Sequence, residues 1–374
     1  MVFDPNPASL DRVRALSPSI PATDDFHDFL KAEIDIVAIC SPDRTHAGYI
    51  VDSFAAGKHV LCEKPLTDSL EGCREILNAE KKAGGLVGAV QHQMRFLPVH
   101  RRMKELISAG ALGIVSYAEG YYVHNLIERA GRFDQWRFEQ GATPLVYAGC
   151  HFVDLLRWLL DDEVEEVSAM ANHLAFPDYP ESDLNTVLLR FRSGAIGNVV
   201  VAFGAARPQD HSVRVYGTRR SIENNLLFEE NGDFMVIARP FLQKPYGPSI
   251  RWRAWAKDIK DGLKAILAGR ATEWLLSPFR GKAGEYSVQG YPFRLYEHSH
   301  AVRASLEDFV RAVRTRSRPL CTLLEGAKTA ATCLAGVEAY RTGQTVSMGA
   351  YWLPEFGDAP GGGAGIARAS EKQA

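Results

Sequence analysis

The sequence predicts an α/β domain with a parallel sheet, followed by an α+β domain with a large, mostly antiparallel open sheet. The chain has 374 residues, which is enough for two domains. In its first part, short apolar runs alternate with helix-like segments, as in βαβ units. From Gly113 onward, long stretches of alternating polar and apolar residues take over, and this pattern is typical of half-buried strands.

In the first part we expect short buried strands connected by helices. The apolar runs predict strands at residues 34–40, 59–62 and 86–90. The segments between them predict helices at residues 11–15, 24–31, 47–56 and 68–83. The last of these helices begins with the capping signal Asp68-Ser69-Leu70-Glu71 and ends at Gly84-Gly85.

In the second part we expect one large sheet with helices over one face. A helix at residues 98–108, closed by Gly110, leads out of the first part. The alternating stretches predict strands at residues 115–122, 164–172, 186–191, 195–203 and 211–216. Further helices are expected at about 149–160, 305–315 and 324–342.

Composition excludes several classes of protein. A net charge of −2 and a pI near 6.6 argue against a nucleic-acid-binding protein. No stretch approaches 18 apolar residues, so the sequence predicts no membrane span. The six cysteines lie mostly in apolar segments without metal-ligand spacing. We therefore expect reduced core cysteines, no metal site and a cytoplasmic protein.

The segment Gly57-Lys58-His59-Val60-Leu61-Cys62-Glu63-Lys64-Pro65 is the most informative in the chain. The apolar run in this segment predicts a strand, and Glu63 and Lys64 follow at the carboxyl end of that strand. In a parallel α/β sheet, ligands bind outside the carboxyl ends of the strands. Lys64 is therefore predicted to be a cation at a nucleotide site, with a surface ion pair to Glu63 as the alternative.

Taken together, several motifs resemble the glucose-fructose oxidoreductase, inositol dehydrogenase and rhizopine-catabolism (Gfo/Idh/MocA) family of NAD(P)-dependent oxidoreductases. Each motif is weak alone, but their order and spacing are specific, and the resemblance runs from about Phe3 to Ser347. The motifs are Ile39-Cys40-Ser41-Pro42 with Thr45-His46, residues 57–65, Gly149-Cys150-His151-Phe152-Val153-Asp154, residues 188–197, and Val215-Tyr216-Gly217-Thr218.

The resemblance implies a Rossmann-type nucleotide-binding domain at residues 1–96, here without its first strand-turn-helix. Family members open with a strand, a glycine-rich turn and a helix that bind the cofactor pyrophosphate. This sequence begins at what looks like the end of the second strand. We expect a misplaced start codon and roughly 25–30 further residues. True loss of the segment is the alternative, but it would expose two strand edges inside a core.

The remaining boundaries follow from the pattern. We expect an α+β substrate and dimerisation domain at residues 97–350 and a disordered, Gly/Ala-rich tail at 351–374. Residues 229–296 exceed a compact sheet connection and form an insertion. Within it, residues 249–270 are basic with Trp on the apolar face. We favour packing against the protein or a twin subunit, with a substrate lid or membrane contact as alternatives.

The resemblance also implies the catalytic residues. Lys64 matches the family's lysine, which stabilises the developing oxyanion, and His151 matches its catalytic base. A packing histidine at a helix start is the alternative for His151. Tyr147 occupies the position, four residues before the histidine, where many relatives carry Asp. Its phenol could donate a hydrogen bond to the substrate oxygen, or it signals a different substrate or lost activity.

The cofactor is expected to be NAD or NADP, with NAD favoured because Asp4 stands where an acidic residue binds the ribose hydroxyls. The expected cofactor contacts are Asp4, Ser41, Pro42, His46, Glu63, Lys64 and Arg137. Three of them have structural alternatives. Asp4 could form an Asx turn, His46 could cap a helix, and Arg137 could form a structural ion pair.

The expected substrate contacts are Gln91, Arg95, Trp136 and Asp154. An interdomain hydrogen-bond network is the alternative for Gln91 and Arg95, and Asp154 could simply brace its helix. We expect an oxidoreductase that transfers hydride between the cofactor and a secondary hydroxyl of a sugar, cyclitol or related polyol. A non-catalytic binding or scaffold subunit is the alternative. The resemblance also implies a homodimer or homotetramer, because in the family the open face of such a sheet often pairs subunits.

Overall fold

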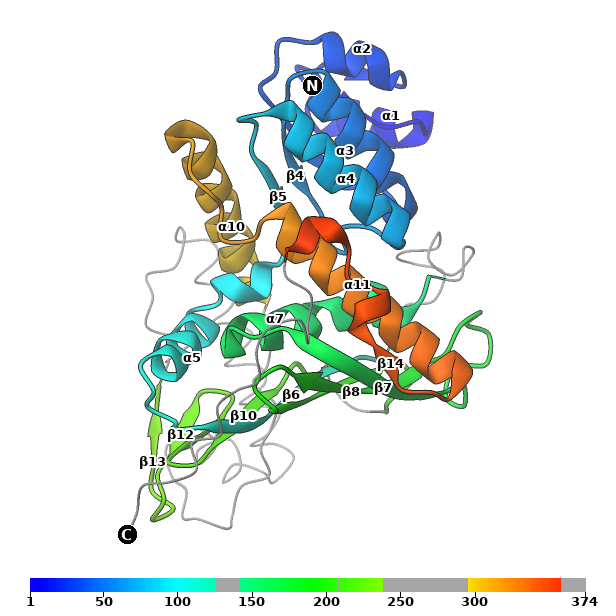
Figure 1. Ribbon diagram of the computed structural model, residues 1–374. Coiled ribbons are helices and arrows are strands. Elements are labelled where there is room, and N and C mark those ends of the chain that lie inside the picture. The colour runs from blue at the N-terminus through cyan, green and yellow to red at the C-terminus, as the bar shows by residue number, and fades with distance from the viewer. Residues whose placement is uncertain (126–141, 207–208, 238–294, 358–374) are drawn as a thin grey trace, which may run out of the picture.

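The computed structural model describes residues 1–125, 142–206, 209–237 and 295–357. The described part has a first α/β layer at the N-terminal end and a large sheet at the other, with helices between them (Figure 1). The expected strands and helices of both parts are present, most of them with shifted ends. The fold class predicted from the sequence, a Rossmann-type domain plus a domain with a large, mostly antiparallel sheet, is confirmed.

The first domain holds parallel strands in two separate sheets. Strands β3 (Ile36–Ile39), β4 (His59–Cys62) and β5 (Gly88–Val90) form one sheet in that order. Strands β1 (Val2–Phe3) and β2 (Ala22–Thr23) form the other. The ring of Phe3 lies 5.1 Å from Phe26 and 5.6 Å from Tyr49, so aromatic packing attaches β1 to the helices.

The helices of the first domain begin where side chains cap them. They are α1 (Pro7–Leu16), α2 (Phe26–Lys31), α3 (His46–Ala55) and α4 (Leu70–Ala83). The side chains of Asn6, Asp25 and Ser69 accept hydrogen bonds from the first turns of α1, α2 and α4. Gly84 ends α4 with φ of 39°, a left-handed conformation that glycine adopts without strain.

The large sheet of the second domain has nine strands in the order β13-β12-β11-β10-β6-β9-β8-β7-β14. Its only parallel pair among the described residues joins β6 and β9; every other neighbouring pair is antiparallel. The strands are β6 (Val115–Val123), β7 (Val164–Asn172), β8 (Leu184–Phe191), β9 (Ile196–Ala202), β10 (Val213–Gly217), β11 (Ser221–Glu223), β12 (Leu226–Phe228), β13 (Phe234–Val236) and β14 (Val346–Ser347).

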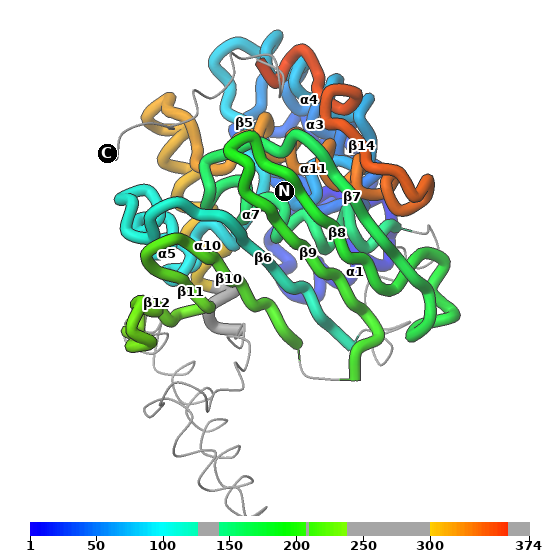
Figure 2. The backbone as a smooth tube through the Cα atoms, turned by 60° about the horizontal axis from the view of Figure 1, so that its bottom comes forward, coloured from blue at the N-terminus to red at the C-terminus, as the bar shows by residue number. Residues whose placement is uncertain are grey.

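One face of this sheet is covered by helices, and the other is not covered by any described element (Figures 1 and 2). The helices of this half of the chain are α5 (Pro98–Ser108), α7 (Cys150–Leu160), α10 (Leu295–Thr315) and α11 (Leu323–Thr342). Phe152 of α7 fills the space that a side chain at Gly120 of β6 would need. The helix layer therefore lies directly on the strands.

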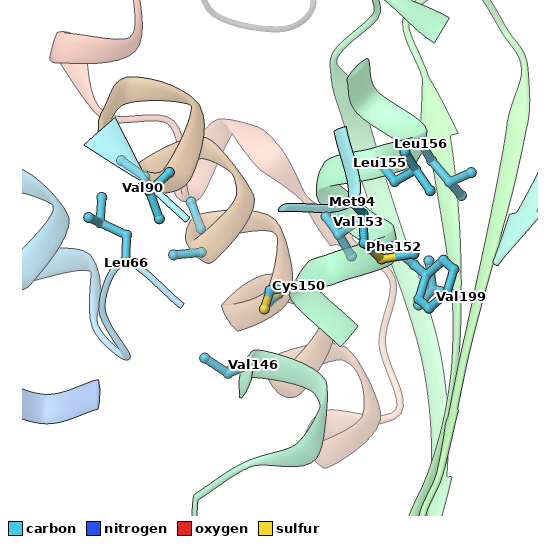
Figure 3. Close-up of a cluster of buried hydrophobic side chains, with 14 of the residues drawn as sticks. Leu66, Val90, Met94, Val146, Cys150, Phe152, Val153, Leu155, Leu156 and Val199 are labelled. Carbon is cyan, nitrogen blue, oxygen red and sulfur yellow. The ribbon is translucent and has the colours of Figure 1, made fainter. Parts of the chain in front are cut away.

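Helix α11 joins the two domains. Val90 and Leu66 of the first domain contact it at Gly326, where an added Cβ would lie 2.9 Å from Val90. Figure 3 shows Val90 and Leu66 on one side of α11 and α7 on the other. Because α11 contacts α4, α7 and β7, one apolar core runs from the parallel strands to the large sheet.

Several expectations need correction. The expected insertion starts at 229, but β12 and β13 form a hairpin across that position, so the sheet continues to Val236. Helix α10 begins at Leu295, ten residues before its expected start. Residues 351–357 belong to the tail that was expected to be disordered, but Leu353 and Phe356 are buried in the core, and residues 358–374 lie outside the described residues. The basic segment at 249–270 lies outside the described residues.

No described helix has the length and apolarity needed to cross a bilayer. All six cysteines are in the part of the chain that the structure describes, and no disulfide joins any of them. Five are buried and Cys40 is exposed. Burial raises the pKa of the Cys62 and Cys73 thiols, which keeps them protonated.

Candidate active site

The ends of β3 and β4 bring four expected site residues together. Ser41 and Pro42 follow β3, and Glu63 and Lys64 follow β4. The paired register of the two strands, with Ile39 opposite Cys62, places these residues at one edge of the sheet. This edge is where doubly wound sheets bind nucleotides.

His46 holds this edge together from inside the protein. Its Nδ1 lies 2.9 Å from the carbonyl oxygen of Pro65, and its Nε2 lies 2.9 Å from that of Ser41. The ring is fully buried. The expected contact between His46 and the cofactor is therefore corrected: the imidazole fixes the two segments that carry Ser41 and Lys64.

Lys64 reaches from the first domain to the second. Its Nζ donates a hydrogen bond of 2.9 Å to the carbonyl oxygen of Tyr147. Tyr147 lies in a π-helical turn, Leu145–Gly149, that leads directly into α7. Such turns occur often at functional sites. The contact uses the main chain, so Lys64 is held near α7 whichever side chain occupies position 147.

The Tyr147 side chain is buried among aromatic rings. Its ring centroid lies 5.5 Å from Phe203, and its hydroxyl accepts a hydrogen bond from the Tyr179 hydroxyl at 3.5 Å. Tyr147 is 7% exposed. The phenol therefore lies beside Tyr179 and Phe203, while its carbonyl faces Lys64.

His151 lies in the first turn of α7, four residues after Tyr147. Its imidazole is stacked on Tyr122 of β6, with centroids 5.8 Å apart and planes 4° from parallel. The ring is 6% exposed. Lys64 and His151, expected to share the chemistry, are thus brought to the same end of α7 from opposite domains.

Tyr122 also contacts a pair of imidazoles that the sequence did not single out. The Nε2 atoms of His124 and His211 are 2.7 Å apart. Tyr122 is stacked on His124 with centroids 4.5 Å apart, and its centroid is 4.6 Å from His211. His124 lies just beyond β6 and His211 just before β10, so only the pairing of these two strands brings the histidines together.

Asp154 and Arg95 form a fully buried ion pair. Arg95 donates to both carboxylate oxygens of Asp154, from Nε at 2.8 Å and from Nη2 at 2.6 Å. Arg95 is 2% exposed and Asp154 is 0% exposed. Arg95 also donates to Glu325 at 3.1 Å. This ion pair is the interdomain network that was the structural alternative for Arg95, and the expected substrate contacts of Asp154 and Arg95 stay predictions.

A second group of charges extends this pair. Arg157 donates to both oxygens of Glu163 and to Thr329, and Lys328 donates to Glu163 at 2.7 Å. Burial alone would raise the pKa of Glu325, but Arg157 and Arg95 outweigh it and lower the pKa to about 2. These charges therefore satisfy one another inside the helix layer.

A cavity of about 630 Å³ is lined in part by these charges. Arg95, Arg157 and Glu325 line it, together with Trp158 and residues of the 308–322 segment. Lys64 and His151 do not line it. This cavity is therefore separate from the centre at the start of α7.

Gln91 and His92 follow β5 and are both buried. The Gln91 side chain accepts a hydrogen bond of 2.7 Å from the Ser305 hydroxyl of α10, and its expected substrate contact stays a prediction. His92 Nε2 lies 3.8 Å from Asp154. Burial lowers the pKa of His92 to about 4, which keeps its imidazole neutral between Asp154 and the cations around it.

Asp4 follows β1 and is half-buried. Its Oδ1 accepts a hydrogen bond of 2.8 Å from the Asn6 N–H, which is the Asx turn given as its structural alternative. The second carboxylate oxygen of Asp4 can still accept a hydrogen bond from a ribose hydroxyl, so the Asx turn does not exclude the expected cofactor contact. Trp136 and Arg137 lie outside the described residues.

The residues at this edge fit a nicotinamide cofactor in type and place. Asp4 after β1, Ser41 and Pro42 after β3, and Glu63 and Lys64 after β4 all lie at carboxyl ends of parallel strands. Among the residues that the structure describes, no group of three His, Cys, Asp or Glu side chains is arranged to hold a metal ion.

Two family models match the chain. The model described as an oxidoreductase family with an NAD-binding Rossmann fold matches residues 1–91. The model of the GFO/IDH/MocA C-terminal domain matches residues 100–223. Together they match most of the first domain and the part of the second domain that ends at residue 223.

Curated relatives agree with these models. Inositol 2-dehydrogenase 3 of Saccharopolyspora erythraea is 33% identical over 262 residues, which are 70% of this chain and 71% of that protein. A 1,5-anhydro-D-fructose reductase of Ensifer adhaerens is 26% identical over a match that covers 84% of this chain and 80% of that protein. An inositol 2-dehydrogenase of Rubrobacter xylanophilus is 28% identical over a match that covers 54% of this chain and 56% of that protein.

Solved structures share the fold. Scyllo-inositol dehydrogenase of Lactobacillus casei, with bound cofactor NAD(H) and scyllo-inositol, matches 93% of this chain and 90% of its own with a TM-score of 0.69 and 18% identity. An oxidoreductase of Agrobacterium radiobacter matches 94% of this chain and 91% of its own with a TM-score of 0.71 and 17% identity. These identities support the fold alone.

Proposed function

Because this chain belongs to the GFO/IDH/MocA family of oxidoreductases, we propose that it is an NAD(P)-dependent dehydrogenase acting on a secondary hydroxyl of a sugar, cyclitol or related polyol. The observation that carries the proposal is the 2.9 Å hydrogen bond from Lys64 to the Tyr147 carbonyl. It joins the cation at the end of β4 to the turn that begins the helix of His151. Named relatives that act on inositol and anhydrofructose support the substrate class.

When bound, the nicotinamide ring supplies the hydride acceptor or donor. In the oxidation, the carbinol C–H bond breaks and the hydroxyl proton must leave as the carbonyl forms. His151 takes that proton, since a neutral imidazole accepts one near physiological pH. The Lys64 ammonium stabilises the negative charge that develops on the oxygen. Reduction runs through the same two groups in reverse.

Lys64 can stabilise the charge on the substrate oxygen while it donates a hydrogen bond to the Tyr147 carbonyl. An ammonium group has three N–H donors, and the described structure uses one of them for the carbonyl at 2.9 Å. That bond fixes the direction of the side chain, so little rotamer entropy is lost when the substrate binds.

For the cofactor we propose NAD in preference to NADP. Asp4 at the end of β1 would accept hydrogen bonds from the ribose hydroxyls and repel a 2′-phosphate. Competing titrations of NAD and NADP into the protein would test this. Tighter binding of NADP would contradict it.

The proposed function is tested by following NAD(P)H absorbance with a panel of inositols, aldoses and alditols. His151→Asn should lower turnover far more than cofactor affinity, because the imidazole is proposed to act on the substrate proton. The pH profile of kcat/KM should lose the limb contributed by a histidine base. A protein that turns over none of the panel and binds neither cofactor would instead be a binding or scaffold subunit.

We also propose that a second copy of the chain covers the uncovered face of the large sheet. Apolar side chains are exposed there, with Leu188 46% and Met170 81% exposed on β8 and β7. Figure 2 looks onto this face. Light scattering coupled to gel filtration would test the proposal, and a monomer at micromolar concentration would contradict it.

A further inference from the structure

The segment of residues 41–46 links β3 to α3 at the proposed cofactor edge, and its first residue is held at two points. The carbonyl oxygen of Ser41 lies 2.9 Å from His46 Nε2. The Ser41 hydroxyl accepts a hydrogen bond of 2.7 Å from the Thr45 hydroxyl. The main chain and the side chain of Ser41 are therefore both fixed from within the protein.

Ser41 and Lys64 lie at the same edge of the sheet. The last paired residues of β3 and β4 are Ile39 and Cys62, and Ser41 and Lys64 each follow two positions later. Ser41 is half-buried, so part of the residue is accessible to a ligand. Because Lys64 is the proposed catalytic cation, the Ser41 hydroxyl is placed to contact the half of the cofactor that carries the nicotinamide.

Thr45 stands where a threonine usually caps a helix. It directly precedes α3, but its side chain makes no capping hydrogen bond to that helix. Its hydroxyl is directed back along the segment, where Ser41 Oγ and the Pro42 carbonyl oxygen each lie 2.7 Å away. The Thr45 hydroxyl is therefore used to hold the segment that carries Ser41 and not to cap the helix.

The hydrogens of these two hydroxyls can be assigned. The Pro42 carbonyl also accepts the Thr45 N–H at 2.8 Å, so it has a donor that does not depend on the Thr45 side chain. The Ser41 oxygen accepts from the Thr45 hydroxyl. Since a hydroxyl has one hydrogen of its own besides its acceptor sites, the Ser41 hydrogen remains available to a ligand. A hydroxyl that accepts one hydrogen bond also donates a stronger one.

We propose that Thr45 is a positioning residue that directs the Ser41 hydroxyl, as a hydrogen-bond donor, to an acceptor oxygen of the cofactor. This inference rests on the proposed function, because it assumes a nicotinamide cofactor at this edge. The acceptor belongs either to the pyrophosphate and ribose part or to the carboxamide of the nicotinamide. Thr45 contributes to cofactor affinity through Ser41 alone.

A double-mutant cycle on cofactor affinity tests the proposal. The dissociation constant of NAD is measured by calorimetry for Ser41→Ala, Thr45→Val and the double variant. We expect binding to weaken roughly 3- to 100-fold in Ser41→Ala, which spans the loss of a donor to a neutral or a charged acceptor, and roughly 2- to 10-fold in Thr45→Val. The double variant should bind no more weakly than Ser41→Ala, because Thr45 acts through Ser41.

Two further variants separate positioning from a purely structural role. Thr45→Ser keeps the hydroxyl and should restore near-normal NAD affinity. Thr315→Val is the matched control, because the exposed Thr315 hydroxyl also donates to a main-chain carbonyl, that of Arg311 at the end of α10. It should leave NAD affinity unchanged. Additive losses at Ser41 and Thr45, unchanged affinity in Thr45→Val, or an equal loss in Thr45→Ser would overturn the proposal.

ADP-ribose is the second probe, since it contains the pyrophosphate and both riboses but no nicotinamide. Weaker ADP-ribose binding in Ser41→Ala would place the acceptor on the pyrophosphate or a ribose, whereas an effect on NAD alone would place it on the carboxamide. Coupling of Ser41 and Thr45 in NAD binding would support the inference even if no polyol were turned over. Polyol oxidation by variants whose NAD affinity is unchanged would overturn the inference while the proposed function stood. Binding of neither NAD nor NADP by the unaltered protein would overturn both.

Discussion

The ammonium of Lys64 donates a hydrogen bond to the main-chain carbonyl of Tyr147, 83 residues away, at a distance of 2.9 Å. This contact crosses between the two domains and reaches the turn from which α7 and His151 follow. Because the acceptor is a carbonyl, it does not depend on the tyrosine side chain. The cation and the imidazole are therefore positioned by the backbone and by the packing of α7.

Replacing Lys64 by alanine should lower turnover by roughly 10²–10⁴-fold, as is typical for a group that handles charge or protons in the transition state. The melting temperature should change little, since Lys64 lies at the edge of the sheet. The matched control is Lys82→Ala on the exposed side of α4. Near-normal turnover of Lys64→Ala under saturating cofactor would remove Lys64 from the mechanism.

Two substitutions at Tyr147 separate its side chain from its carbonyl. Tyr147→Phe should keep turnover within a few-fold, because the Lys64 contact uses the main chain and the phenol faces Tyr179. Tyr147→Asp should lower the melting temperature, since it places a carboxylate in the buried position beside Phe203.

Activity of the Tyr147→Asp protein discriminates two hypotheses. If the tyrosine only replaces a lost orienting carboxylate, activity on polyols is maintained or raised. If the phenol contacts a different substrate, both variants lose activity, and that outcome would contradict the buried position described for the hydroxyl.

The Arg95–Asp154 pair should be essential for stability. Asp154→Ala leaves a buried guanidinium whose one remaining carboxylate partner among the described residues is Glu325, and breaking such a pair typically costs about 3–5 kcal/mol. Urea denaturation would measure the loss in the free energy of unfolding. Asp11→Ala is the control, because it breaks an exposed pair with Arg14 and should cost less than about 1 kcal/mol. Equal costs would show that the buried pair is not a structural contact.

Glu80 of α4 should make stability depend on pH. Burial raises the pKa of its carboxyl to about 7, and Arg318 only partly offsets this. Since the folded state binds the proton more tightly, the contribution of Glu80 to stability is fully present below its unfolded pKa and is lost as the pH rises through 7. Glu80→Gln should therefore raise the melting temperature at pH 8.

The same substitution should have little effect near pH 5, where the carboxyl is already protonated in the folded protein. Glu75→Gln, exposed on the same helix, is the matched control and should show no such dependence. A Glu80→Gln protein whose stability gain is the same at both pH values would rule out the titration of Glu80 as its cause.

The sequence by itself determined the order of elements and the residues at strand ends. Strand β4, helix α5 and strand β7 have the bounds expected from their patterns, because alternation and capping are local properties. For the same reason Lys64 could be placed at the carboxyl end of a parallel strand. His151 could be placed at the start of its helix from the motif around it.

Only the tertiary structure decided which side chains meet. Asp154 and Arg95 are 59 residues apart, and their patterns are equally compatible with a substrate cleft and with a buried pair. His124 and His211 lie at the ends of strands whose pairing, β6 with β10, leaves no local signal. Contacts between distant segments depend on the register and packing of whole elements, and sequence periodicity does not specify those.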